Sequence, residues 1–176
     1  MPDIESVAVE PDHCHRCGAE VGTTQWEGRE HPWCPECDLV LSRHPVPAVH
    51  TVVHDDDTVL LLDEPIPQQE GVLSLPGGYT KYDEEPRVSA LRELEEETSL
   101  RADPADLEFL TIYHAEFPQS SLYFITYALA RSDAAGDLTP EDEGFEAAFR
   151  PVEEVFADDA PLRDSDQERI RMALER

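Results

Sequence analysis

One stretch of the chain, residues 76–100, constrains the fold more than any other. It starts with Pro76-Gly77-Gly78 and runs into a helix-forming segment in which Glu93, Glu96 and Glu97 occupy positions i, i+3 and i+4. This spacing puts three carboxylates on one face of a helix, where they repel each other. A bound divalent cation explains such an arrangement, and hard oxygen ligands suit Mg²⁺ or Mn²⁺. The glycines let the backbone approach a phosphate or offer a carbonyl to the metal.

The alternative interpretation is a solvated acidic helix face, because this chain carries 40 acidic and 13 basic residues. The spacing of further residues, from Gly78 to Leu100, favours the metal site. The segment resembles the Nudix box, G-x5-E-x7-R-E-U-x-E-E-x-G-U with U aliphatic. The residues that match are Gly78, Glu84, Arg92, Glu93, Leu94, Glu96, Glu97 and Leu100. The one departure is Ser99, which stands where the family has glycine at the helix end, a position often left-handed.

The resemblance implies a Nudix α/β/α sandwich over residues 48–176 and an enzyme that hydrolyses an acid anhydride. By position in the box, Glu93, Glu96 and Glu97 would bind magnesium or manganese together with the carbonyl of Gly77. Arg92 would hold Glu84 in a supporting ion pair. Bound metal would neutralise a diphosphate and lower the pKa of an attacking water. The candidate substrate contacts are Gly77, Gly78, Lys81 and Phe117.

In many members of this family a glutamate in a downstream loop completes the metal shell or acts as the base. Glu143 and Glu146 are the candidates here, because the stretch from Glu146 to Phe149 resembles the Glu-Ala-Arg-Phe that follows that loop. An ordinary acidic surface turn explains both residues equally well.

Two cysteine pairs near the N-terminus predict a zinc ribbon over residues 13–44. Two residues separate the cysteines of each pair and sixteen separate the pairs, which is typical of a closed, four-thiolate structural site. Disulfides or free core thiols are the alternatives, and a cytoplasmic location argues against them. His13, His15 and His31 lie nearby and are expected at the surface. The four predicted zinc ligands are Cys14, Cys17, Cys34 and Cys37.

The remaining pattern predicts an α/β domain that follows a flexible leader (residues 1–12) and a proline-rich joint at 45–47. A hairpin is expected to open the domain, turning at residues 55–57. The expected strands are Ala48–Val53, Thr58–Leu62, Val72–Leu75, Leu107–Tyr113, Ser121–Ala130, which should be central, and one near Phe149.

Three helices are expected in the same domain. The first starts near Pro86, the second at about Val152, and the last is capped by Asp164 or Ser165. An acidic turn at 140–144 separates the last strand from those before it. The expected buried face of the first helix consists of Val88, Leu91, Leu94 and Thr98.

The net charge is −27 and Lys81 is the sole lysine. This charge indicates the salt concentration to which the protein is adapted and the partners it can bind. Molar salt screens such self-repulsion, so an extreme halophile is the expected source. Nonspecific nucleic-acid binding needs clustered basic residues, and the zinc ribbon has none. No run is apolar enough to span a bilayer and the N-terminus does not resemble a secretion signal, so the expected location is the cytoplasm. The sequence leaves the oligomeric state open between a monomer and a homodimer.

The expected substrate is a small nucleoside diphosphate derivative. A zinc ribbon ahead of a Nudix domain resembles the ADP-ribose and NADH pyrophosphatase branches. The motif Ser-Gln-Pro-Trp-Pro-Phe-Pro-x-Ser marks the NADH branch, and here only Phe117, Pro118 and Ser120 agree with it. ADP-ribose, cleaved to AMP and ribose 5-phosphate, is therefore preferred. The alternatives are an NADH pyrophosphatase and a non-catalytic nucleotide-sensing regulator.

Overall fold

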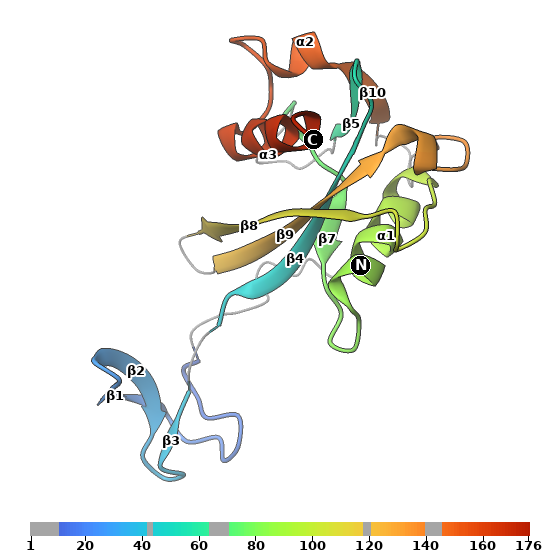
Figure 1. Cartoon of the computed structure of the whole chain (residues 1–176). Helices are drawn as coiled ribbons and strands as arrows, with labels where there is room; N and C mark the ends of the chain where they lie inside the picture. Colours follow the sequence, from blue (N-terminus) through green and yellow to red (C-terminus); the bar gives the residue numbers. More distant parts are fainter. Residues whose placement is uncertain (1–10, 42–43, 64–70, 118–120, 140–145) are drawn as a thin grey trace. The chain divides into compact units, whose positions relative to one another are not determined.

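The computed structural model describes residues 11–41, 44–63, 71–117, 121–139 and 146–176 (Figure 1). By their contacts the residues divide into two compact units, which are treated separately below. One unit contains the chain up to Val46 together with Ala115–Leu122, and the other contains Pro47–His114 together with Tyr123–Arg176. The expected leader lies outside the described residues except for its last two positions, and so does the turn expected at 140–144.

The N-terminal residues form a small antiparallel sheet in the order β1-β2-β3. Its strands are β1 (Gly22–Trp26), β2 (Arg29–Cys34) and β3 (Leu39–Val40). Trp26 packs edge-on against His31 with ring centroids 5.4 Å apart. His31 is therefore half-buried, whereas His13 and His15 are exposed as expected.

The larger sheet has seven strands, five of them in the order β10-β5-β4-β9-β8, while β6 pairs with β5 and β7 pairs with β4. The strands are β4 (Val46–His54), β5 (Thr58–Asp63), β6 (Leu73–Ser74), β7 (Gly77–Tyr79), β8 (Glu108–Glu116), β9 (Ser121–Ala130) and β10 (Glu146–Pro151). The expected hairpin is confirmed, since β4 and β5 are antiparallel and Asp55 Oδ1 accepts the backbone N–H of Thr58 at 2.7 Å. The strand expected to be central, Ser121–Ala130, is β9, an inner strand between β4 and β8. The middle position of the five-strand order belongs to β4.

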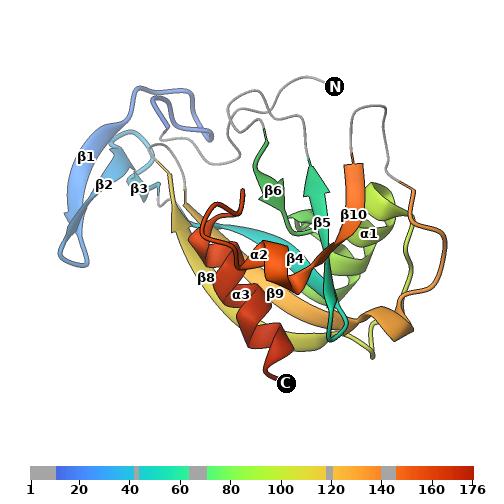
Figure 2. The same ribbon diagram turned by 90° about the horizontal axis from the view of Figure 1, so that it is seen from above.

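Helices cover both faces of this sheet, as Figure 2 shows. They are α1 (Pro86–Thr98), α2 (Val152–Val155) and α3 (Asp164–Leu174), with a short 3₁₀ turn at Arg131–Asp133. Alternate residues of a strand point to opposite faces. Val49 and Val53 of β4 accordingly pack with the core under α1, whereas Val52 packs with the core under α2 and α3. The α/β/α arrangement follows.

Three details differ from the sequence expectations. Pro47 belongs to β4 and not to a separate joint, and residues 77–79 form a strand rather than only a turn. The last helix begins at Asp164 after Arg163, with no side-chain cap. The two strand differences arise because β4 and β7 pair with each other, which local sequence signals do not report.

The buried face of α1 also differs from the expected one. Val88 is 46% exposed, and Ser89 and Ala90 are buried in its place. Ser89 tolerates burial because its hydroxyl donates a hydrogen bond to Glu84. Leu94 and Thr98 are buried as expected.

Ser99 ends α1 in the left-handed region, with φ 64° and ψ 6°. Its backbone N–H caps the helix by bonding to the carbonyl of Glu95 at 2.9 Å, and its hydroxyl donates to the carbonyl of Thr139 at 3.1 Å. A non-glycine residue in this region costs on the order of 1 kcal/mol. The helix therefore ends where the family places glycine, and the serine departs from the box without displacing the helix terminus.

Within the described residues, no helix combines the length and the apolar character that crossing a membrane requires.

Candidate active site

The strand β7 brings Gly77 and Gly78, the first residue of the box, against both β4 and α1. Gly77 pairs with His50, and a Cβ built on Gly77 would lie 2.0 Å from the carbonyl oxygen of Val49. Its φ of 155° is also one that side chains rarely allow. The Gly77 N–H donates to Glu97 Oε2 at 2.8 Å, and a Cβ on Gly78 would lie 2.7 Å from the Glu93 carboxylate. Residue 77 therefore cannot carry a side chain against β4, and a side chain at residue 78 would displace the Glu93 carboxylate.

Arg92 connects the acidic groups around β7. Its Nε donates to Glu84 Oε1 at 2.9 Å, while Nη1 donates to Glu93 Oε1 at 2.6 Å and to Glu96 Oε2 at 2.9 Å. Its Nη2 donates to the carbonyl of Tyr79 at 3.1 Å. One guanidinium thus fixes β7 and three carboxylates relative to each other, because its five donors are held in one plane.

Glu84 is held as an anion by this arrangement. Its hydrogen bonds with Arg92, and secondarily with the Ser89 hydroxyl, lower the pKa of Glu84 to about 2 against the opposing effect of burial. Its side chain is 13% exposed. The supporting ion pair between Glu84 and Arg92, which the resemblance implied, is present in the structure.

The donor set on α1 suits a hard cation. Glu97 and Glu93 supply carboxylate oxygens beside the backbone of Gly77 and Gly78, and Glu96 lies on the same helix. Burial raises the pKa of Glu93, while its ion pair with Arg92 opposes this shift. The three carboxylates are not gathered into one tight group, since Arg92 stands between Glu93 and Glu96.

The four cysteines form a second candidate metal centre. Their sulfur atoms all lie within 4.8 Å of one another, and in the described part of the chain they alone make such a group of three or more potential ligands. None forms a disulfide, and Cys17 Sγ lies 3.5 Å from Cys34 Sγ. Tetrahedral zinc with Zn–S bonds of about 2.3 Å needs sulfurs about 3.8 Å apart. The cluster has the size of a zinc site.

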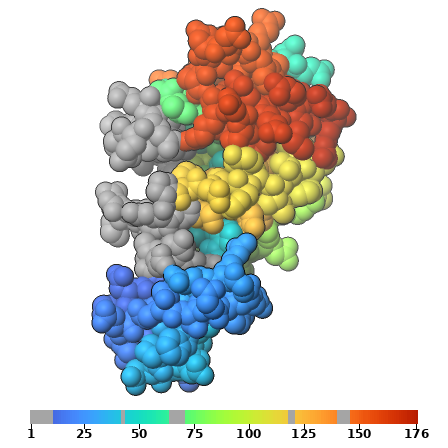
Figure 3. Space-filling view, turned by 90° about the vertical axis from the view of Figure 1, so that its left-hand side faces the viewer, coloured from blue at the N-terminus to red at the C-terminus, as the bar shows by residue number. Residues whose placement is uncertain are grey.

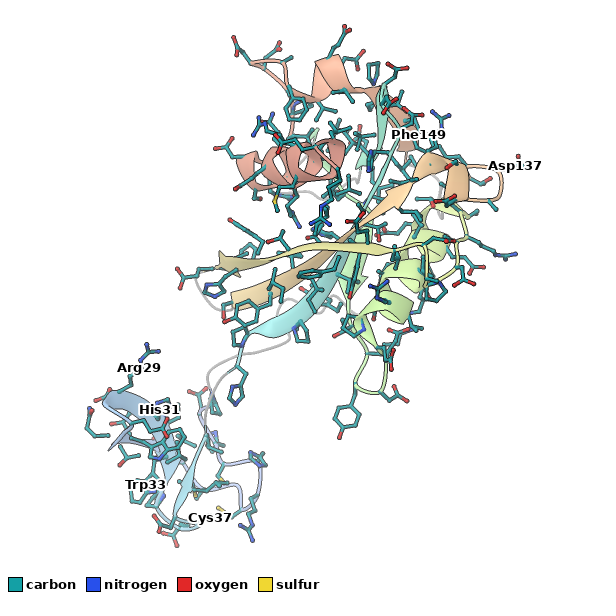
Figure 4. All side chains as sticks on the ribbon, in the orientation of Figure 1. Arg29, His31, Trp33, Cys37, Asp137 and Phe149 are labelled. Carbon is teal, nitrogen blue, oxygen red and sulfur yellow. The ribbon has the colours of Figure 1, made fainter. Side chains whose placement is uncertain are left out.

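The thiols of this cluster influence each other. Backbone N–H groups of Arg16 and Cys17 lower the pKa of Cys14 to about 7, whereas hydrogen bonding with Cys17 raises the pKa of Cys37 to about 12. Figure 4 labels Cys37, which follows β2, the strand that carries Arg29, His31 and Trp33. Among the described residues no histidine belongs to the group, and the four cysteines brought together are the candidate ligands that the spacing predicted.

The other predicted site residues are not brought together with Arg92 and the glutamates of α1. Lys81 is exposed in the loop between β7 and α1, where its backbone N–H donates to Glu84 at 3.4 Å. Phe117 follows β8 and is 49% exposed. Glu146 is the exposed first residue of β10, opposite Asp63 on β5. Glu143 lies outside the described residues, so the choice between Glu143 and Glu146 stays a prediction.

Sequence reasoning missed a buried polar cluster on the opposite face of the sheet. Arg169 of α3 is 3% exposed and ion-paired with Asp166, which is 1% exposed. Its Nη1 lies 2.7 Å from His50 Nδ1 and 3.1 Å from Thr126 Oγ1. Burial, together with the charges of nearby arginines, lowers the pKa of His50 well below its ordinary value, so the ring is neutral. An arginine inside an acidic helix was the available signal.

The family was tested by comparison with known domain models. The model of the NUDIX domain matches residues 44–172, which is most of the chain and includes the glycines, Arg92 and the glutamates described above. The chain belongs to the Nudix family.

Two curated Nudix relatives show similarity over about 60% of the chain. They are an ADP-sugar pyrophosphatase of Mus musculus, 24% identical over 107 residues, and an ADP-ribose pyrophosphatase of Methanocaldococcus jannaschii, 27% identical over 106 residues. The matched region covers 61% and 60% of this chain, and 49% and 62% of the respective relatives. The chain therefore spans only about half to three fifths of the relatives it matches.

Solved structures share the fold. A NUDIX hydrolase from Nitrosomonas europaea superposes with a TM-score of 0.61 at 20% identity, covering 94% of this chain and 91% of that one. The NUDIX domain of Shewanella oneidensis NrtR, solved with ADP ribose, gives a TM-score of 0.63 at 20% identity and covers 81% of this chain and 92% of that one. At these identities the likeness concerns the Nudix fold alone.

Proposed function

We propose that this Nudix protein is a metal-dependent hydrolase that cleaves the diphosphate bond of a nucleoside diphosphate derivative. The observation that carries the proposal is the junction of β7 and α1, where Gly77 and Gly78 lie against Glu97 and Glu93. Because the glycines carry no side chains, the backbone of β7 lies close to carboxylates of α1 that can hold a cation for a diphosphate. Membership of the family supports the same reading.

The chain's own residues divide the work as follows. Glu93, Glu96, Glu97 and the carbonyl of Gly77 would hold magnesium or manganese. When bound, such an ion neutralises phosphate charge and lowers the pKa of an attacking water. Arg92 of α1 bonds Glu84 and the carbonyl of Tyr79, and so holds α1 and β7 in fixed positions relative to each other. Gly78 lets a phosphate approach the backbone, and Lys81 is a candidate to pair with it.

We expect ADP-ribose to be cleaved to AMP and ribose 5-phosphate with a higher kcat/KM than NADH, and both to exceed nucleoside triphosphates. The names of the two curated relatives and the ADP ribose bound to the NrtR domain support ADP-ribose as the first substrate to test. A missing contact to the second ribose or the nicotinamide changes selectivity by about 1 to 3 kcal/mol. The measurement is kcat/KM for the three substrate types at high salt.

Each other ranking has a definite meaning. A clear preference for NADH would move the chain to the NADH pyrophosphatase branch. A preference for triphosphates would contradict the assignment to either branch, and binding without turnover would favour a nucleotide-sensing regulator.

The proposal includes a cytoplasmic protein adapted to high salt, with structural zinc held by the four cysteines. We expect the melting temperature to rise with KCl into the molar range, because the screening length falls to about 3 Å at 1 M and relieves repulsion within a net charge of −27. Thermal unfolding at increasing KCl tests this expectation. A flat or falling curve would remove the halophile interpretation and leave the enzymatic one intact.

A further inference from the structure

The polar cluster around Arg169 is built to hold one side chain, His50, in one orientation. An arginine only donates hydrogen bonds, so His50 Nδ1 accepts from Arg169 Nη1 and the ring proton sits on Nε2. The ring of Phe124 stacks on His50 with centroids 4.4 Å apart and an interplanar angle of 22°. Rotation of His50 would break both contacts.

Arg169 is itself held from several sides. Its Nε donates to the backbone carbonyl of Ser165 at 3.0 Å, and its remaining donors reach Asp166 and Thr126. Its guanidinium also lies 5.6 Å from the ring centroid of Tyr113. Figures 2 and 3 show α3 (red) beside β8 (yellow), in agreement with that contact. A buried charge with this many partners is fixed in place, since losing any one of them is costly.

The held ring lies against the backbone of the candidate metal site. A Cβ built on Gly77 would lie 2.4 Å from Cδ2 of His50, so the imidazole occupies the space where residue 77 would otherwise carry a side chain. Gly77 supplies the N–H that holds Glu97 and the carbonyl expected to bind the metal. The position of His50 therefore limits where both of these groups can lie.

We propose that Asp166, Arg169 and His50 form a relay that positions Gly77, and through it Glu97, for divalent-cation binding. This inference rests on the metal site of the proposed function. These contacts run from Arg169 of α3, through His50 in the sheet, to Gly77 and then to Glu97 of α1, on the other side of the sheet. His50 and Arg169 are thus positioning residues that touch neither metal nor substrate. Outer partners of this kind typically contribute about 10- to 100-fold to metal affinity.

Two substitutions of His50 separate its hydrogen bond from its volume. In His50→Asn, the amide can place Oδ1 where Nδ1 accepts from Arg169 and Nδ2 where Cδ2 meets Gly77. In His50→Leu, two methyl groups fill the same positions, but nothing accepts from Arg169. We expect Mn²⁺ to bind His50→Asn nearly as tightly as wild type, and His50→Leu with a Kd raised by roughly 10- to 100-fold.

The experiment is calorimetric titration of the full chain with MnCl₂ in the absence of substrate, with thermal unfolding in parallel. Gln167→Ala is the matched control, because Gln167 of α3 donates to the carbonyl of Val155 and not to the relay. It should leave the Kd for Mn²⁺ unchanged. Should His50→Leu not fold, Arg169→Lys gives the same test, since lysine can keep a charge beside Asp166 but lacks the fork that reaches His50 and Thr126.

The outcomes are distinct. Equal Mn²⁺ affinity in wild type, His50→Asn and His50→Leu would overturn the relay, and so would a loss in His50→Leu that Gln167→Ala reproduces. Wild-type protein that binds no Mn²⁺ at all would instead overturn the metal site of the proposed function.

Discussion

Replacement of Glu97 by glutamine, or of Glu93 by glutamine, is expected to reduce turnover by more than the roughly 10- to 100-fold that loss of an outer partner costs a metal site. Each change removes one negative charge from the candidate metal shell. The fold should survive, because the glutamine oxygen at position 97 can still accept the Gly77 N–H. The measurement is kcat and kcat/KM with added Mg²⁺ or Mn²⁺, together with the melting temperature.

Glu95→Gln is the matched control for this prediction. Glu95 lies on the same helix and pairs with Arg101 at 2.6 Å, with a side chain 47% exposed. The substitution makes the same change of charge away from β7, so it should leave turnover close to wild type. Turnover that survives both Glu93→Gln and Glu97→Gln, or that survives EDTA, would favour the nucleotide-sensing alternative.

Removal of zinc is expected to unfold the N-terminal sheet while the larger sheet stays folded. Structural zinc contributes on the order of 10 to 16 kcal/mol to small sites of this kind, and the three short strands have little apolar core of their own. Elemental analysis should find one tightly held zinc per chain, at Cys14, Cys17, Cys34 and Cys37. A metal-free chain with two disulfides would contradict the prediction.

The two tryptophans of the chain, Trp26 and Trp33, both lie in this small sheet. Their fluorescence therefore reports its unfolding, while far-ultraviolet circular dichroism reports mainly the larger sheet and the helices. Cys17→Ser should change the tryptophan signal strongly. His15→Ala alters an exposed residue between Cys14 and Cys17 and should not change that signal, because histidine is outside the predicted ligand set.

Local spacing was enough to predict the two metal-binding patterns. Glu93, Glu96 and Glu97 share a helix face because of the helical repeat alone. Each Cys-x-x-Cys pair has the spacing that lets both thiolates of a short turn bind one metal ion. The structure confirms α1 and gathers the four cysteines. The β4–β5 hairpin was equally local, since Asp55 closes its turn on Thr58. The roles of these residues in catalysis stay predictions for the experiments above.

Only the tertiary structure decided how the site is supported. The pairing of β7 with β4, the burial of Ser89 on α1 and the placing of Arg92 among three carboxylates depend on which elements meet in space. His50 and Arg169 are 119 residues apart in the chain, and no periodicity links them. Side-chain repeats within one helix or strand are fixed by backbone geometry, whereas contacts between elements depend on strand order and on how α3 packs across the sheet. The sequence by itself therefore determined the candidate ligands, and the packing of α3 and β7 determined what holds them in place.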